Sequence, residues 1–318
     1  MAKPRSEVVE TAGGGLDQLV EAYLAHQRGR GLSPRSVEQG VAVLGKAFLP
    51  WCRQQGIGEP EQLNQKALDR WSSYLLNERR SPSGKPLARE TVRTYNRVVG
   101  QFTRWAQREG SLAVVKPQPI QKERRVLDVL SREEINHLED AATDERDKLI
   151  IRMLADTGLR LGELLSLRLE DLLEETQRRR FLKVRGKGGK ERKVPCPVPL
   201  YQRLLTYARR GRPRDTDSDY IFLTSRRSGR SHDYERLAPR SLQNMLQFTA
   251  AKAGLKKRVH PHLFRHSFAT WALRRGMNEI QLRDILGHVD LTMIAATYSH
   301  LNQADAYDAL SALLKGEE

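Results

Sequence analysis

The sequence predicts a mainly α-helical protein with a small β-hairpin or sheet, divided into two domains. Along most of the 318 residues, apolar side chains recur at the three- and four-residue spacing of helix faces. Alternation of apolar and charged residues, which is typical of a half-buried strand, is confined to residues 180–195. The helical periodicity fails between residues 110 and 126, where prolines appear. A chain of this length usually forms about two domains.

The charge of the chain indicates a polyanionic partner. Lys and Arg number 55 against 39 Asp and Glu, which leaves a net charge of +16. Such an excess is the electrostatic footprint of a nucleic-acid-binding protein, although a ribosomal or merely basic protein is the alternative. With 30% charged and 39% hydrophobic residues the chain is expected to be folded and not intrinsically disordered.

Cysteine usage and the N-terminus favour a cytoplasmic, nucleoid-associated protein. Cys52 and Cys196 are far apart and lack a C-x-x-C partner, so the sequence indicates neither a disulfide framework nor a thiolate metal site. No apolar run approaches the length of a membrane helix, and no secretory h-region is present, so no membrane partner is expected. Residues 1–15, which end in three glycines, are predicted to be a flexible leader.

Residues 16–112 are predicted to form a bundle of four helices. The first begins at Leu16, the second follows the Ser33-Pro34 start signal, and apolar stripes through Trp71 and Phe102 mark the third and fourth. Basic side chains surround these stripes, and a DNA-facing side is the functional interpretation, while a solvated helix surface is the common alternative. The DNA-binding candidates of this domain are Arg28, Arg30, Arg35, Arg89 and Arg93.

A linker over residues 113–127 precedes the second domain, residues 128–318. Its first helix is predicted from a capping box in which Ser131 is the N-cap and Glu134 is at N3. The predicted hairpin follows, and between residues 178 and 193 it carries nine Lys or Arg and one acid, Glu191. Arg185 and Lys190 are its DNA-binding candidates, although lysines also protect an exposed sheet edge.

Motifs in the second domain carry residue types suited to attack on a phosphodiester. Arg160 and Glu163 lie three residues apart where one helix ends and another begins, although such a pair is commonly a surface ion pair. His262 and Arg265 also share one helix face, with Cβ atoms about 5–6 Å apart. His288 follows Leu-Gly, and Tyr298 comes ten residues later. A zinc cluster of His260, His262 and His266 is the alternative, but the Glu of a zincin helix is missing.

The order of these motifs resembles the tyrosine recombinase family, which includes phage integrases and Xer-like site-specific recombinases. The matching elements are R-x-x-E at 160–163, the G-K-G-x-K-E-R hairpin with Lys187, H-x-x-R-H at 262–266, L-G-H at 286–288, and Y-x-H from Tyr298. The resemblance implies an N-terminal four-helix core-binding (SAM-like) domain that clamps DNA, followed by an α+β catalytic domain.

The resemblance also implies roles for individual residues. Tyr298 would attack the scissile phosphate and form a 3′-phosphotyrosyl intermediate, while Arg160 and Arg265 hold the non-bridging oxygens. Lys187 would protonate the leaving 5′-oxygen, His262 would act as acid or base toward Tyr298, and His288 would hydrogen-bond the phosphate. Glu163 would support the arginines. No metal, ATP or other cofactor is required.

The partners implied are double-stranded DNA with specific recombination sites and further copies of the chain. A homo-tetramer on synapsed DNA is expected, with a C-terminal helix carrying Tyr307, Leu310, Leu313 and Leu314 docked on a neighbouring copy. Other functions remain open on sequence grounds: a type IB topoisomerase-like enzyme, a non-catalytic DNA-binding regulator, or a metal-dependent nuclease.

Overall fold

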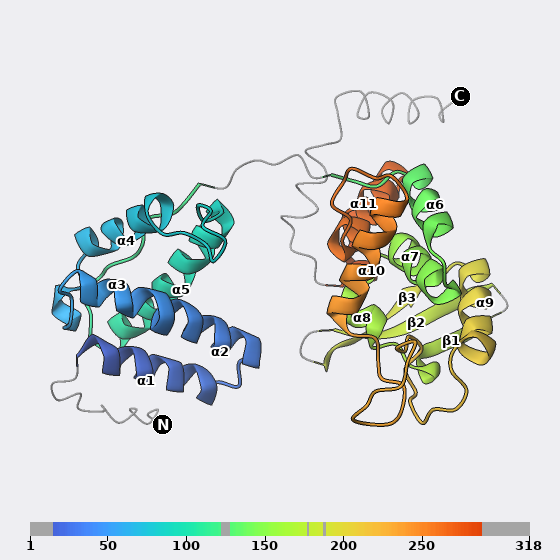
Figure 1. The fold of residues 1–318 in the computed structure, drawn as a ribbon, viewed down its shortest axis with the longest axis horizontal. Helices are drawn as coiled ribbons and strands as arrows, with labels where there is room; N and C mark the ends of the chain where they lie inside the picture. Colours follow the sequence, from blue (N-terminus) through green and yellow to red (C-terminus); the bar gives the residue numbers. More distant parts are fainter. Residues whose placement is uncertain (1–14, 122–127, 177, 187–188, 288–318) are drawn as a thin grey trace, which may run out of the picture. The chain divides into compact units, whose positions relative to one another are not determined.

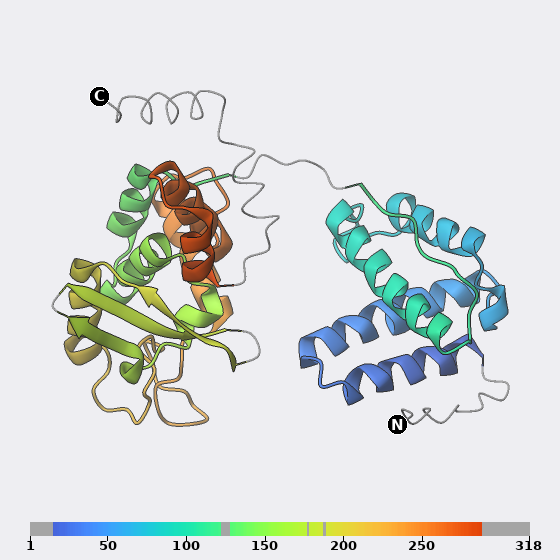
Figure 2. The same cartoon turned by 180° about the vertical axis from the view of Figure 1, so that it is seen from behind.

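The computed structural model describes residues 15–121, 128–176, 178–186 and 189–287. The chain divides into two compact units, residues 1–124 and 125–318 (Figures 1 and 2). Each unit has its own hydrophobic core. The predicted leader lies outside the described residues, except for Gly15. Among the described residues, none of the helices combines the length and apolar character that crossing a membrane requires.

Unit 1 is helical, as its apolar stripes predict. Ser33 caps the second helix by accepting a hydrogen bond from the Ser36 backbone N–H at 3.3 Å. That helix continues through a π-helical segment into the next one, so the predicted second helix is confirmed with a local change of pitch. The elements are α1 (Leu16–Gly29), α2 (Pro34–Gly40), the π-helix (Val41–Phe48), α3 (Leu49–Gln54), a 3₁₀ turn (Pro60–Gln62), α4 (Gln65–Asn77) and α5 (Arg89–Arg108).

Aromatic side chains from separate helices form the core of unit 1. Trp71 of α4 and Phe102 of α5 are fully buried, and so is Phe48 at the end of the π-helix. The rings of Phe48 and Trp71 meet edge to face with centroids 5.1 Å apart, a favoured geometry for aromatic pairs. The stripe residues therefore face one common core.

Unit 2 places an antiparallel sheet beside a group of helices (Figure 1). The predicted hairpin is confirmed as β2 (Arg179–Arg185) and β3 (Glu191–Pro195), with Leu182 opposite Val194. Strand β1 (Leu172–Thr176), which pairs with the other edge of β2, was not predicted. The mainly helical class with a small sheet is confirmed.

The helices of unit 2 pack around α7, whose central residues are buried. Ser131 and Glu134 form the predicted capping box at the start of α6. Helix α9 packs against β2, and α12 packs against β3. The helical elements are α6 (Arg132–Ala141), α7 (Glu145–Thr157), α8 (Leu161–Leu165), a 3₁₀ turn (Leu169–Asp171), α9 (Val198–Thr206), a π-helical turn (Tyr207–Gly211), α10 (Pro239–Lys252), α11 (Pro261–Arg274) and α12 (Glu279–Leu286).

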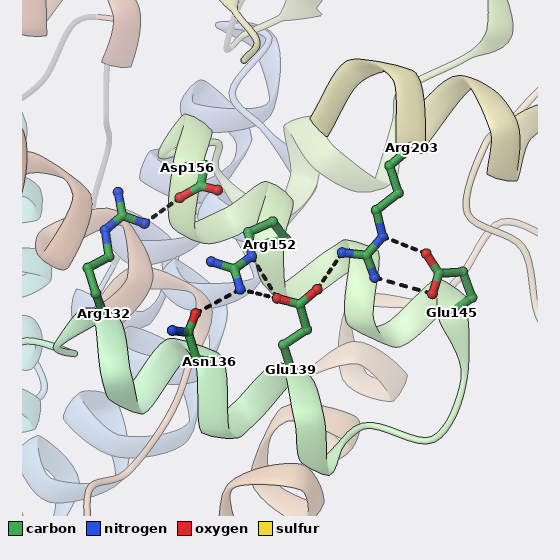
Figure 3. Close-up of polar contacts among 7 residues, drawn as sticks. All are labelled: Arg132, Asn136, Glu139, Glu145, Arg152, Asp156 and Arg203. Carbon is green, nitrogen blue, oxygen red and sulfur yellow. Dashed lines mark hydrogen bonds and ion pairs between the residues drawn. The ribbon is translucent and has the colours of Figure 1, made fainter. Parts of the chain in front are cut away.

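An ion-pair network joins α6, α7 and α9 (Figure 3). Glu139 of α6 accepts hydrogen bonds from Arg152 of α7 and Arg203 of α9, and Arg203 also pairs with Glu145. The Glu139 side chain is only 13% exposed. Burial would raise its pKa, but the hydrogen bonds from Arg203 and Arg152 outweigh burial and lower the pKa below its ordinary value.

Candidate active site

The site begins where α7 ends at Gly158. This residue adopts the left-handed conformation with φ of 62°, and a Cβ atom built there would lie 2.6 Å from Phe268 and 2.7 Å from Leu286. Only glycine therefore fits both the backbone and the space. The sharp turn allows Arg160, two residues later, to occupy the N-cap of α8.

Arg160 and Glu163 form the predicted pair in a buried setting. Arg160 Nη1 donates to Glu163 Oε1 at 2.8 Å, and the Arg160 backbone N–H donates to Oε2 at 2.9 Å. The Glu163 side chain is 4% exposed, while that of Arg160 is 38% exposed. The pair is therefore not the solvated surface pair that its spacing alone would favour. A buried carboxylate holds a partly accessible guanidinium.

Arg192 of β3 is a further partner of Glu163 that the sequence motifs did not single out. Its Nη1 and Nη2 donate to Oε1 and Oε2 of Glu163, each at 2.9 Å. Burial would raise the pKa of Glu163, but the hydrogen bonds from Arg192 and the Arg160 backbone outweigh burial and lower it. Arg192 lies in the predicted G-K-G-x-K-E-R hairpin. That motif was the sequence signal that could have identified Arg192 as a residue of the site.

Helix α11 contributes Arg265, which is 3% exposed. Its Nη1 donates to the Gly158 carbonyl at 2.8 Å, and its Nη2 donates to the Leu286 carbonyl at 2.7 Å. Burial, with added repulsion from Arg160 and Arg192, lowers the pKa of Arg265 to about 10. The guanidinium therefore stays charged at neutral pH and lacks a carboxylate hydrogen-bond partner among the described residues.

The C-terminal end of α12 gathers the arginines. The Ile285 carbonyl accepts from Arg192 Nε at 2.9 Å, and the Leu286 carbonyl accepts from Arg160 Nη1 at 3.3 Å as well as from Arg265. The Gly287 carbonyl accepts from Arg160 Nη2 at 3.4 Å. The last carbonyls of a helix lack intrahelical partners and carry partial negative charge, so guanidinium groups satisfy them well.

The histidines of α11 have different surroundings. His260 caps the helix by accepting from the Leu263 backbone N–H at 3.2 Å. Burial and the nearby cations Arg265 and Arg160 lower the pKa of His262, which keeps its imidazole neutral at pH 7 and able to take a proton. His266 has a buried Nδ1 without a partner among the described residues. In the described ranges, no group of His, Cys, Asp or Glu side chains is arranged to hold a metal ion.

A cavity of ≈ 1020 Å³ lies beside the arginines, between the hairpin and α12. Its wall carries four cationic side chains, Arg160, Lys190, Arg192 and Arg283, against two carboxylates, Glu191 and Asp284, which leaves a net charge of +2 on the described lining. A site of this charge with guanidinium forks suits a phosphate or phosphodiester.

The remaining predicted residues fall into separate groups. Lys187, His288, Tyr298 and the predicted C-terminal helix lie outside the described residues. In unit 1, Arg28, Arg30, Arg35 and Arg89 are exposed, while Arg93 pairs with Glu90 at 2.8 Å. In unit 2, Lys190 is exposed, and Arg185 donates to Glu170, Asp171 and Glu191 at 3.1 to 3.2 Å.

An arginine pair with a neutral histidine beside it, on a helical domain with a small sheet, is the arrangement expected of a phosphodiester-transfer enzyme. The sequence profile of the phage integrase family matches residues 128–305. Tyrosine recombinase XerA of Pyrococcus furiosus is 39% identical over 59% of this chain and 64% of its own length. Tyrosine recombinase XerC of Alcanivorax borkumensis is 35% identical over 72% of this chain and 74% of its own.

A solved structure has the same fold. The Tn1549 transposon integrase (residues 82–397), whose structure was solved in complex with transposon right end DNA, superimposes with a TM-score of 0.69 at 18% identity, over 93% of this chain and 99% of that one. The chain belongs to the phage integrase family. The family predicted from the motifs is confirmed, and the chain spans just under two thirds of the XerA relative.

Proposed function

We propose that this chain is a site-specific DNA recombinase that cuts and rejoins strands through a 3′-phosphotyrosyl intermediate. The observation that carries the proposal is the arrangement of Arg160 and Arg265, whose guanidinium groups converge on the Leu286 carbonyl beside a basic cavity. The relatives named tyrosine recombinases support it. The predicted order of motifs supplies the nucleophile, Tyr298.

The reaction is a pair of phosphoryl transfers. The Tyr298 oxygen forms a bond to phosphorus while the bond to the 5′-oxygen breaks, and the Tyr298 proton passes to His262. Lys187 gives a proton to the leaving 5′-oxygen, and Arg160, Arg265 and His288 stabilise the charge on the non-bridging oxygens. In the second transfer a 5′-hydroxyl of another strand forms the bond to phosphorus and gives its proton to Lys187, while the bond to the Tyr298 oxygen breaks and His262 returns the proton to Tyr298. The phosphotyrosyl bond conserves the diester linkage, so neither ATP nor metal enters the reaction.

The proposed partner is duplex DNA that carries a recombination site. The Tn1549 integrase was solved with transposon DNA, and unit 1 of this chain carries exposed arginines on a helical bundle. We assign unit 1 to clamping DNA and unit 2 to catalysis, and expect a tetramer on paired sites, with the C-terminal helix docked on a neighbouring copy. Such a protein acts at the nucleoid, in the cytoplasm.

The test is covalent trapping on DNA in EDTA. A nicked candidate site loses the short fragment after cleavage, so the protein–DNA adduct accumulates and is read on a denaturing gel. We expect an adduct from the unaltered protein and none from Tyr298→Phe. Arg160→Ala and Arg265→Ala should slow adduct formation by about 100- to 1,000-fold, because each removes a donor to the developing charge.

Controls separate the alternative functions. An adduct that persists in Tyr298→Phe would exclude this nucleophile, and the absence of any adduct from the unaltered protein on its site would exclude the recombinase. Relaxation of supercoiled DNA without strand exchange would indicate a topoisomerase. Cleavage that requires a divalent ion and leaves no adduct would indicate a nuclease.

A further inference from the structure

Arg192 joins segments of unit 2 that are distant in sequence. Its guanidinium forks onto Glu163 of α8 with both Nη atoms at 2.9 Å, and its Nε donates to the Ile285 carbonyl of α12 at 2.9 Å. The side chain is 16% exposed. A fork with one hydrogen bond from each of its three nitrogens fixes its partner in position and in rotation.

Glu163, which Arg192 holds in place, in turn holds Arg160. Its Oε1 accepts from both Arg160 Nη1 and Arg192 Nη1, so the two guanidinium groups share one oxygen. The other contacts of Arg160, to the Leu286 and Gly287 carbonyls, are longer at 3.3 and 3.4 Å. The hydrogen bond from Arg160 to Glu163 is therefore the short, charge-assisted one, and it holds the partly exposed Arg160 side chain in place.

The surroundings of Arg192 are closely fitted. Gly287 has φ of 66°, and a Cβ atom there would lie 3.0 Å from both Cζ and Nε of Arg192. A side chain at residue 287 would therefore displace the guanidinium that holds Glu163. The backbone at Gly287 therefore lies in close contact with the Arg192 guanidinium.

We propose that Arg192 is a positioning residue for the strand-cleaving reaction. Held between Glu163 and the Ile285 carbonyl, it fixes the carboxylate that orients Arg160 toward the scissile phosphate. The role concerns geometry as well as charge, so lysine, which has no fork, cannot replace it. The inference rests on the proposed recombinase function, and its tests therefore include one that needs no DNA.

The first test measures the mobility of the Arg160 side chain in the free protein. Arginine-labelled protein gives Nε–Hε NMR signals, and Arg160→Lys identifies the signal of Arg160. We expect an ordered Arg160 side chain in the unaltered protein and increased mobility in Arg192→Lys and Arg192→Gln. Unchanged order of Arg160 in both variants would overturn the proposal, whether or not the protein cleaves DNA.

The second test measures single-turnover adduct formation on the nicked site at saturating protein. We expect Arg192→Lys and Arg192→Gln to slow it by about 10- to 100-fold, as loss of a group that orients a catalytic residue commonly does, with little change in DNA affinity. Because Arg192 acts through Glu163, the double variant with Glu163→Gln should be no slower than Glu163→Gln alone. Full activity in Arg192→Lys, or additive losses in the double variant, would overturn the proposal.

Matched variants address general destabilisation. Arg203→Gln also removes a forked arginine from an ion-pair network of unit 2 (Figure 3). Its partners, Glu139 and Glu145, are not among the partners of Arg192 or Arg160, so the change should leave Arg160 order and the cleavage rate unchanged. Gly287→Ala should reproduce the Arg192 phenotype without altering Arg192. Gly254→Ala, with φ of 70° and open space around it, should not. If Arg160 becomes mobile in the Arg192 variants while the unaltered protein forms no adduct, the positioning stands and the recombinase function fails.

Discussion

Gly158 is the residue on which the geometry of the site most depends. It ends α7 in the left-handed conformation, its carbonyl accepts from Arg265, and Arg160 follows two residues later. The packing of Phe268 and Leu286 against its Cα leaves no room for a side chain. Backbone conformation, packing and the arginines of the candidate site are thus joined at one position.

Replacing Gly158 by alanine should therefore destabilise unit 2 strongly. The left-handed conformation costs a non-glycine residue about 1–2 kcal/mol, and overpacking adds about 1–3 kcal/mol. Urea unfolding measures the loss, with Gly254→Ala as the control because it carries the backbone cost without the contact. Equal losses for the two variants would show that the packing at Gly158 contributes nothing.

The candidate site was predicted in part from the sequence. Arg160 with Glu163, and His262 with Arg265, are pairs within one helical segment, so their short spacing indicates that they meet. Arg192 lies 29 residues from Glu163 in the chain. Its contact depends on how the sheet packs in the folded chain, with β2 against α8 and β3 against α12. The hairpin motif contains Arg192, but a long-range contact has no local signature, so the sequence did not reveal Glu163 as its partner.

At the scale of elements, the apolar stripes predicted the helices. Strand β1 and the π-helical segment were not predicted, and each has a local cause. Strand β1 reads L-L-E-E-T, which lacks the alternation of a half-buried strand, and its burial decreases along the strand toward Thr176. The π-helical segment Val41–Phe48 has an ordinary helical stripe, because a changed hydrogen-bond pattern leaves little trace in composition. Strand pairing and packing in the folded chain determine both the formation of β1 and the π-helical hydrogen bonding.

The network of α6, α7 and α9 makes the stability of unit 2 depend on pH. Glu139 has a pKa lowered from 4.5, so its contribution is present above that value and is lost as the pH falls through the lower, folded-state pKa. We expect Glu139→Gln to lower the free energy of unfolding at pH 7 by about 1–3 kcal/mol, because two arginines lose a charged partner.

Urea unfolding at pH 7 and at successively lower pH measures this effect. The difference between Glu139→Gln and the unaltered protein should shrink as the pH falls through the lowered, folded-state pKa of Glu139, because the carboxylate is then protonated in both the folded and the unfolded states. Asp140→Asn, an exposed change on the same helix, is the control and should have little effect at either pH. A difference that stays constant with pH would contradict the prediction.

At the scale of the whole molecule, each unit buries its own core. The core of unit 1 centres on Trp71, Phe48 and Phe102, and that of unit 2 on α7 with Leu182 and Phe222. A separate core is the physical condition for independent folding. The hydrophobic patterns therefore indicate units that can be studied separately.

We expect residues 1–124 and 125–318, produced as separate chains, each to unfold cooperatively. Far-UV circular dichroism against urea measures this, and the full chain should show the sum of the two transitions if they are independent. A non-cooperative profile for either piece would show that it needs the other to fold. The Trp71→Ala variant of residues 1–124 should be about 3–5 kcal/mol less stable, because it empties the centre of the core.

The carbonyls at the end of α12 give the site a particular tolerance to sequence change. Arg160, Arg192 and Arg265 are held there by the main chain of residues 285–287, and main-chain acceptors persist whatever side chain the residue carries. An apolar exchange at Ile285 therefore removes no acceptor, whereas Leu286 is constrained by its packing against Gly158 and Gly287 is constrained by Arg192. A change of side chain at Ile285 would thus keep the same arginine geometry, because the acceptor belongs to the main chain.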